Sequence, residues 1–106
     1  MAKLNEQRRT VNLSVHLYPP LNGAAGRDLV QLILDAPATV GDALQALIAR
    51  YGAEMRRYLC DERGRIVPAW TAFVNDAPVQ LNRNEALRTP VNDGDELALI
   101  LNLAGG

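Results

Sequence analysis

The chain has 106 residues, 48% of them hydrophobic and 22% charged, and its 11 Lys+Arg against 12 Asp+Glu give a formal net charge of -1. A chain of this length can bury roughly two thirds of its unfolded surface, which supports one core but not two domains. The near-zero charge argues against a protein that binds nucleic acid by general phosphate neutralisation.

Residues 11–18 alternate strictly between apolar and polar side chains, the pattern of a half-buried strand. The inward positions are Val11, Leu13, Val15 and Leu17. Two prolines and the polar, glycine-containing run 22–26 then break the chain. A second apolar alternation follows at residues 29–34, so this part of the sequence predicts a hairpin.

A helix is predicted over residues 40–51. Thr39 stands where an N-cap belongs, Asp42 suits the positive end of the helix dipole, and Gly52 can close the helix as a left-handed cap. One apolar stripe runs along this helix, at Val40, Leu44, Leu47, Ile48 and Tyr51. We expect the stripe to pack on the hairpin.

After this helix, residues 53–60 can form a second short helical turn, and residues 61–65 read as a polar turn. Residues 70–74 have the composition of a strand and stop at an Asn-Asp turn. Residues 78–81 then form a short edge strand, because Pro78 cannot donate a hydrogen bond to a ladder.

The last strand is predicted at residues 97–101, the most apolar run of the chain, after an irregular polar loop at residues 82–90. A strand that is apolar on both faces belongs in the centre of a sheet. Strands grouped around one main helix predict an α+β fold, a mixed sheet with the helix packed across it.

Few side chains in this sequence are suited to catalysis. Cys60 is the only cysteine, so neither a disulfide within the chain nor a paired-cysteine metal site is expected. The only histidine, His16, lies on the outward face of the first strand, where a solvated residue is more common than a catalyst. We expect Cys60 to be a packing residue and the protein to hold no metal.

We expect a protein of the cytoplasm with no membrane association. Residues 1–10 lack the apolar core of a signal peptide and read as a flexible N-terminal segment. No apolar run approaches the length that spans a bilayer.

The sequence ends in Ala104, Gly105 and Gly106, directly after the strand expected at the sheet centre. Two glycines make a thin, conformationally free tail that is suited to insertion into a partner. From residue 102 its extended reach is about 16–18 Å. A frayed terminus explains the glycines alone equally well.

Three stretches together resemble the ubiquitin-like (β-grasp) sulfur carriers: residues 74–76 (Val-Asn-Asp), residues 92–97 (Asn-Asp-Gly-Asp-Glu-Leu) and the terminal Ala-Gly-Gly. That family includes the small subunit of molybdopterin synthase, the thiamine-pathway sulfur carrier and a carrier that serves a cysteine synthase. The resemblance implies a β-grasp domain over residues 11–101 and a flexible tail over residues 102–106.

What the resemblance implies is a carrier, not an enzyme. An activating enzyme would use ATP to adenylate the Gly106 carboxylate, a persulfide protein would displace AMP, and the acyl group would then be converted to a thiocarboxylate. That group would give its sulfur to a synthase subunit, with Ala104 and Gly105 inserted in the partner. The chain itself would hold no permanent cofactor and bind no nucleic acid.

The pathway stays open between molybdopterin-type cofactor biosynthesis and cysteine or thiamine biosynthesis. Carriers of molybdopterin type often have prolines where residues 101–103 read Leu-Asn-Leu, and residues 55–68 are long, as in the cysteine-synthase subfamily. Two alternatives to a sulfur carrier also remain: a ubiquitin-like modifier joined to lysines through Gly106, and a plain β-grasp interaction module.

Two groups of residues are candidates for partner contact. Phe73 points away from Ala72 and Val74, and with Leu101 and Leu103 it can form either a docking patch or ordinary core. Four arginines form the second group, as a solvated face or a contact for an acidic surface: Arg56, Arg57, Arg63 and Arg65.

Overall fold

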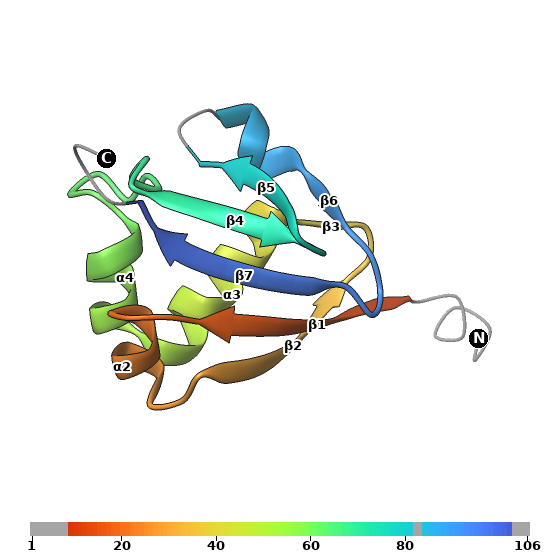
Figure 1. Ribbon diagram of the computed structural model, residues 1–106, viewed down its shortest axis with the longest axis horizontal. Coiled ribbons are helices and arrows are strands. Elements are labelled where there is room, and N and C mark those ends of the chain that lie inside the picture. The colour runs from red at the N-terminus through yellow and green to blue at the C-terminus, as the bar shows by residue number, and fades with distance from the viewer. Residues whose placement is uncertain (1–8, 82–83, 103–106) are drawn as a thin grey trace, which may run out of the picture.

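The computed structural model describes residues 9–81 and 84–102, and it contains the predicted mixed sheet with one main helix across it (Figure 1). The strands are β1 (Thr10–Leu17), β2 (Leu29–Asp35), β3 (Ala38–Thr39), β4 (Trp70–Val74), β5 (Ala77–Gln80), β6 (Pro90–Val91) and β7 (Glu96–Leu101). The helices are α2 (Leu21–Ala25), α3 (Val40–Tyr51), α4 (Ala53–Leu59) and the 3-10 helix η1 (Asn84–Arg88). No helix in these described residues is long and apolar enough to cross a membrane.

The five-stranded sheet has the order β2-β1-β7-β4-β5. β1 pairs antiparallel with β2, as the hairpin prediction requires, and parallel with β7. β7 also pairs antiparallel with β4, so the apolar last strand is central as predicted. All four inward positions predicted for β1 are buried. The edge position predicted for the strand after Pro78 is confirmed in β5.

Helix α3 covers one face of this sheet, and its N-terminus has the predicted cap (Figure 1). The Thr39 side chain accepts a hydrogen bond from the Asp42 amide at 3.2 Å, and the Asp42 carboxylate accepts one from the Thr39 amide at 2.9 Å. This reciprocal pair satisfies two amides that the helix leaves free. The stripe is buried apart from Tyr51, which is half-buried. Gly52 ends α3 as predicted, with a positive φ of 82°. Its ψ of -146° is not that of the left-handed helical conformation, so that part of the prediction is wrong.

Helix α2 forms directly after the two prolines, where the sequence predicted only a break in the chain. Its Leu21 is fully buried, and Gly26, at a φ of 75°, closes it with an amide hydrogen bond to the Asn22 carbonyl. Glycine takes this conformation without the strain that a Cβ would add. The five residues of α2 are too few to show a helical period, so the glycine-containing sequence predicted a break in the chain where a helix forms.

The region predicted as an irregular loop contains two elements. η1 packs closely on the start of α3, where a Cβ added to Gly41 would lie 3.0 Å from the Leu87 carbonyl oxygen. β6 then pairs with β3, and the Val40 amide donates to the Thr89 carbonyl at 2.9 Å. These contacts join segments that are far apart in the sequence. Local sequence patterns do not predict such contacts.

The turn that leads into β7 is hydrogen-bonded to β1. The Asp93 carboxylate accepts hydrogen bonds from the side-chain and backbone amides of Asn12, both at 2.8 Å. These bonds hold the pKa of Asp93 below its usual value. The polar turn predicted before the last strand therefore also fixes the register of β7 beside β1.

Candidate functional site

Asn102, the last residue that the structure describes, is held by two hydrogen bonds. Its amide donates to the Ala69 carbonyl at 2.8 Å, which continues the β4–β7 ladder by one residue. Its side-chain oxygen accepts a hydrogen bond of 2.5 Å from the Thr71 hydroxyl. Asn102, the first residue of the predicted tail, is thus hydrogen-bonded to the folded domain. Leu103, Ala104, Gly105 and Gly106 lie outside the described residues.

Thr71 is the buried polar residue of the described core, at 8% exposure. We expect Thr71→Val to lower the free energy of unfolding by about 0.5–1.5 kcal/mol, because Asn102 loses its hydroxyl donor. Denaturant titration measures this loss, and NMR relaxation should show greater motion at the Asn102 amide. Thr10→Val, at an exposed position of β1, is the matched control. An unchanged stability with an equally rigid Asn102 would contradict a role for this bond in holding the tail.

The predicted docking patch is divided between the two faces of the sheet. Phe73 pairs with Ala98 and faces away from α3, as predicted, and it is half-buried. Leu101 pairs with Trp70, whose side chain is in the core, so Leu101 belongs to the opposite face although it is 38% exposed. Because side chains alternate along a strand, the β7 residues that share the face of Phe73 are Ala98 and Ile100.

A row of paired residues crosses this outer face of the sheet. The strand registers place Leu29, His16, Ala98, Phe73 and Pro78 side by side, one from each strand. We call these five residues the outer row. Beyond it, Ile100 and Tyr18 are 38% and 46% exposed. Ile100 was not among the residues predicted from the sequence. Its position two residues after Ala98 in the same strand nevertheless indicates that it lies on the same face.

His16 and Cys60 lie in different environments. The His16 ring nitrogen Nε2 is 2.9 Å from a Glu96 carboxylate oxygen on the outer face. Cys60 is buried at 8% exposure, and this burial raises the pKa of its thiol. A thiol of raised pKa is a poor nucleophile, which supports the interpretation of Cys60 as a packing residue.

The four arginines of the second group, Arg56, Arg57, Arg63 and Arg65, are all exposed. Arg65 lies 3.4 Å from the Asp61 carboxylate, within the predicted polar turn. Amides of that turn also donate to Asp61, and together these contacts lower its pKa. The arrangement fits a solvated face.

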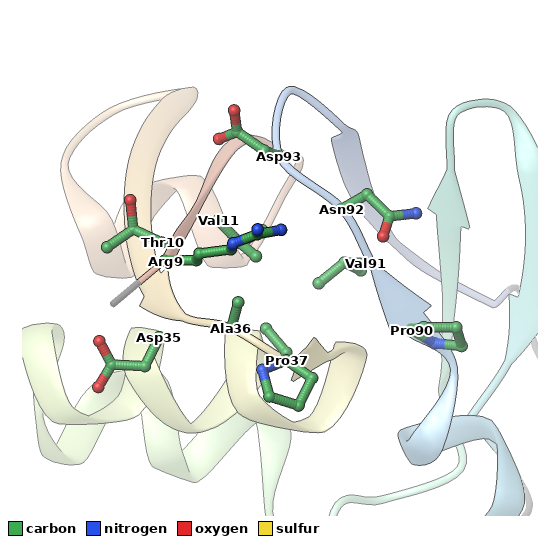
Figure 2. Close-up of a pocket in the computed structure, with 11 residues that line it drawn as sticks. Arg9, Thr10, Val11, Asp35, Ala36, Pro37, Pro90, Val91, Asn92 and Asp93 are labelled. Carbon is green, nitrogen blue, oxygen red and sulfur yellow. The ribbon is translucent and has the colours of Figure 1, made fainter. Parts of the chain in front are cut away.

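A groove of about 790 Å³ lies elsewhere. Figure 2 shows it between the start of β1, the connection from β2 to β3, and β6 with its following turn. Because β1 runs parallel to β7, the start of β1 is at the opposite end of the sheet from Asn102. None of the predicted site residues lines this groove, and we do not assign it to the tail.

Comparison with known proteins agrees with this architecture. SAMP1 from Haloferax volcanii is 27% identical, with 90% of this chain and 99% of that chain covered and a TM-score of 0.75. The small archaeal modifier protein 1 from Methanosarcina acetivorans is 23% identical over 92% of this chain and 99% of that chain, with a TM-score of 0.71. A chain of the BexX/CysO complex from Amycolatopsis orientalis is 24% identical over 89% of this chain and 99% of that chain, with a TM-score of 0.66. The last two likenesses bear on the fold alone. A search of curated proteins found no match.

The fold is thus the ubiquitin-like β-grasp, as the resemblance implied. The model of the ThiS family matches residues 21–106, and the chain belongs to the ThiS family. It is therefore a carrier of the sulfur-carrier or small-modifier kind. Such carriers are not catalysts themselves and pair with activating or sulfur-transfer enzymes.

Proposed function

We propose that this protein is a sulfur carrier whose reactive group is the Gly106 carboxylate. The observation that carries the proposal is the match to the ThiS family, which runs through residue 106. The geometry of the described residues supports it. The central strand β7 leads directly to Asn102, which is anchored on Ala69 and Thr71. Four residues then remain before the carboxylate, with an extended reach of about 13–14 Å.

The chemistry requires no side-chain nucleophile on this chain. A carboxylate oxygen of Gly106 attacks the α-phosphate of ATP in the activating enzyme, and pyrophosphate leaves. The resulting adenylate makes the carboxyl carbon electrophilic, so the terminal sulfur of a persulfide can attack it, expel AMP and form an acyl disulfide. A second thiol of the sulfur-donor protein then attacks the donor's own sulfur in that disulfide, which releases the thiocarboxylate and leaves a disulfide on the donor. The thiocarboxylate is the sulfur donor for a synthase subunit. ATP is consumed by the partner, and the carrier serves as its cosubstrate.

An exchange assay tests this proposal. The activating enzyme of the same host should exchange labelled pyrophosphate into ATP only when this chain is present. Persulfide donor and chain together should then yield a protein whose mass is higher by the difference between sulfur and oxygen. Exchange that is independent of the chain would reject the proposed function.

A small protein modifier is the second candidate, favoured by the 27% identity to SAMP1. Both candidates begin with the same adenylation, but a modifier ends as an isopeptide between Gly106 and a lysine of another protein. Denaturing electrophoresis of host extracts distinguishes them. Ladders of conjugates that disappear when the terminal glycines are removed would favour the modifier, and a free chain bearing a thiocarboxylate favours the carrier.

The recipient of the sulfur belongs to the same proposal. We favour cofactor biosynthesis of molybdopterin type, or cysteine or thiamine biosynthesis, as the pathway. A purified thiocarboxylate form offered separately to the host's molybdopterin synthase large subunit, thiazole synthase and cysteine synthase should react with one of them. That reaction would name the pathway.

A further inference from the structure

A small hollow interrupts the outer row, and Ala98 forms its base. Ala98 stands on β7 between His16 on β1 and Phe73 on β4, both of which have larger side chains. The hollow measures about 200 Å³. Its lining residues are His16, Tyr18, Phe73, Asp76, Glu96 and Ala98. An alanine between two rings therefore leaves space for one side chain from outside.

Two carboxylates border this hollow and are held there by the fold. Asn75 and Asp76 have φ values of 51° and 74° in the two-residue turn between β4 and β5. The Asn75 side chain accepts a hydrogen bond from the Glu96 amide at 2.9 Å and donates one to Asp95 at 2.8 Å. These bonds fix the turn that carries Asp76 against the start of β7. The Glu96 side chain is 65% exposed, and its Oε1 lies 2.9 Å from the His16 ring nitrogen Nε2, so one carboxylate oxygen is in contact with the histidine of the hollow.

The six lining residues combine aromatic walls with negative charge and include no lysine or arginine. Planar guanidinium groups stack on aromatic rings and pair with carboxylates, and arginine is enriched at protein interfaces. A divalent cation is a poorer fit, because the described residues bring no three His, Cys, Asp or Glu side chains together as a metal site.

We propose that this hollow is the recognition site for an arginine side chain of the activating enzyme that docks on the outer row. The guanidinium lies between Phe73 and Tyr18 and pairs with Glu96 and Asp76. The inference rests on the proposed function for the identity of the partner. It adds a specific charged contact, which an apolar patch alone does not supply.

The first test uses the isolated chain and a small probe. N-acetyl-arginine amide, titrated into 15N-labelled protein, should shift the amide signals of Phe73, Glu96 and Ala98 saturably. N-acetyl-citrulline amide has nearly the same shape without the charge and should leave them unchanged. Equal shifts with both probes, or no saturable shift with the arginine probe, would overturn the inference.

The second test measures the Kd between the chain and the host's activating enzyme. Asp76→Asn and Glu96→Gln remove the charges and keep the shape, and asparagine tolerates the positive φ at position 76. We expect each to weaken binding roughly two- to fivefold, with a smaller salt dependence. Asp35→Asn and Glu85→Gln, each made singly, make the same charge change outside the hollow and should leave the Kd unchanged.

The two tests distinguish failure of the inference from failure of the proposed function. If the enzyme activates and binds all the variants equally, the inference fails and the carrier function stands. If the host's enzyme does not act on the chain at all, the proposed function fails. The probe titration then still decides whether the hollow accepts a guanidinium. Weakening by either single control variant as great as that by the hollow variants would also overturn the inference.

Discussion

Adding one residue after Gly106 is expected to abolish adenylation. The extra residue moves the terminal carboxylate by up to about 3.6 Å, measured from Asn102, which is held by its hydrogen bonds to Ala69 and Thr71. Displacement on a phosphate needs the reacting atoms aligned at roughly 3–3.5 Å, so the reaction loses its near-attack geometry. Pyrophosphate exchange should fall at least about a hundredfold.

Gly105→Val should be nearly as damaging, because a β-branched side chain restricts the backbone and adds bulk in the partner's channel. The free energy of unfolding should stay at the wild-type value. Gly23→Val is the matched control, since a Cβ added there meets nothing within 4 Å. Cys60→Ser should also keep exchange activity, provided that it folds. Full activity of the extended chain, or its loss in folded Cys60→Ser, would contradict the assignment of Gly106 as the reactive group.

Leu47→Ala should lower the free energy of unfolding by about 2–5 kcal/mol. Leu47 is fully buried in the face of α3 that packs on the sheet, so its truncation removes apolar burial and leaves a cavity. Chemical denaturation with a constant m-value measures the loss.

Gln45→Ala on the exposed side of the same helix is the control for Leu47→Ala. It changes the same helix without touching the core, and we expect it to stay within about 0.5 kcal/mol of wild type. An unfolding midpoint of Leu47→Ala equal to that of Gln45→Ala would show that the stripe does not carry the core.

Elements with a strong local signal could be predicted from the sequence. The alternation in β1 correctly predicted which of its side chains are buried. Thr39 and Asp42 predicted the first residue of α3. In both cases, propensity, capping and the apolar period agree. The unbroken apolar run of β7 likewise indicated a strand with neighbours on both sides.

The missed elements depend on contacts that the local sequence does not contain. α2 is held by the burial of Leu21, and its five residues are too few to show a period. The pairing of β3 with β6 joins Ala38 to Val91, across half of the chain. Loop-closing contacts of this kind are decided by the tertiary fold.

The candidate site was predictable in part, for a similar reason. Alternation placed Phe73 on the face opposite Ala72, and the structure agrees. The choice of Leu101 as its neighbour needed the register between β4 and β7, which pairs Leu101 with Trp70 and puts Ala98 beside Phe73. The hollow at Ala98 could not be foreseen, because one of its carboxylates comes from the turn between β4 and β5 and the other from the start of β7.

The mass of the C-terminal peptide, taken from the protein purified from its host, tests the central claim most directly. The account predicts a peptide that ends at Gly106, with a fraction heavier by the difference between sulfur and oxygen. That fraction should disappear when the activating enzyme is deleted. A peptide that continues beyond Gly106, or one that carries only oxygen in the wild-type host under conditions of sulfur demand, would contradict it.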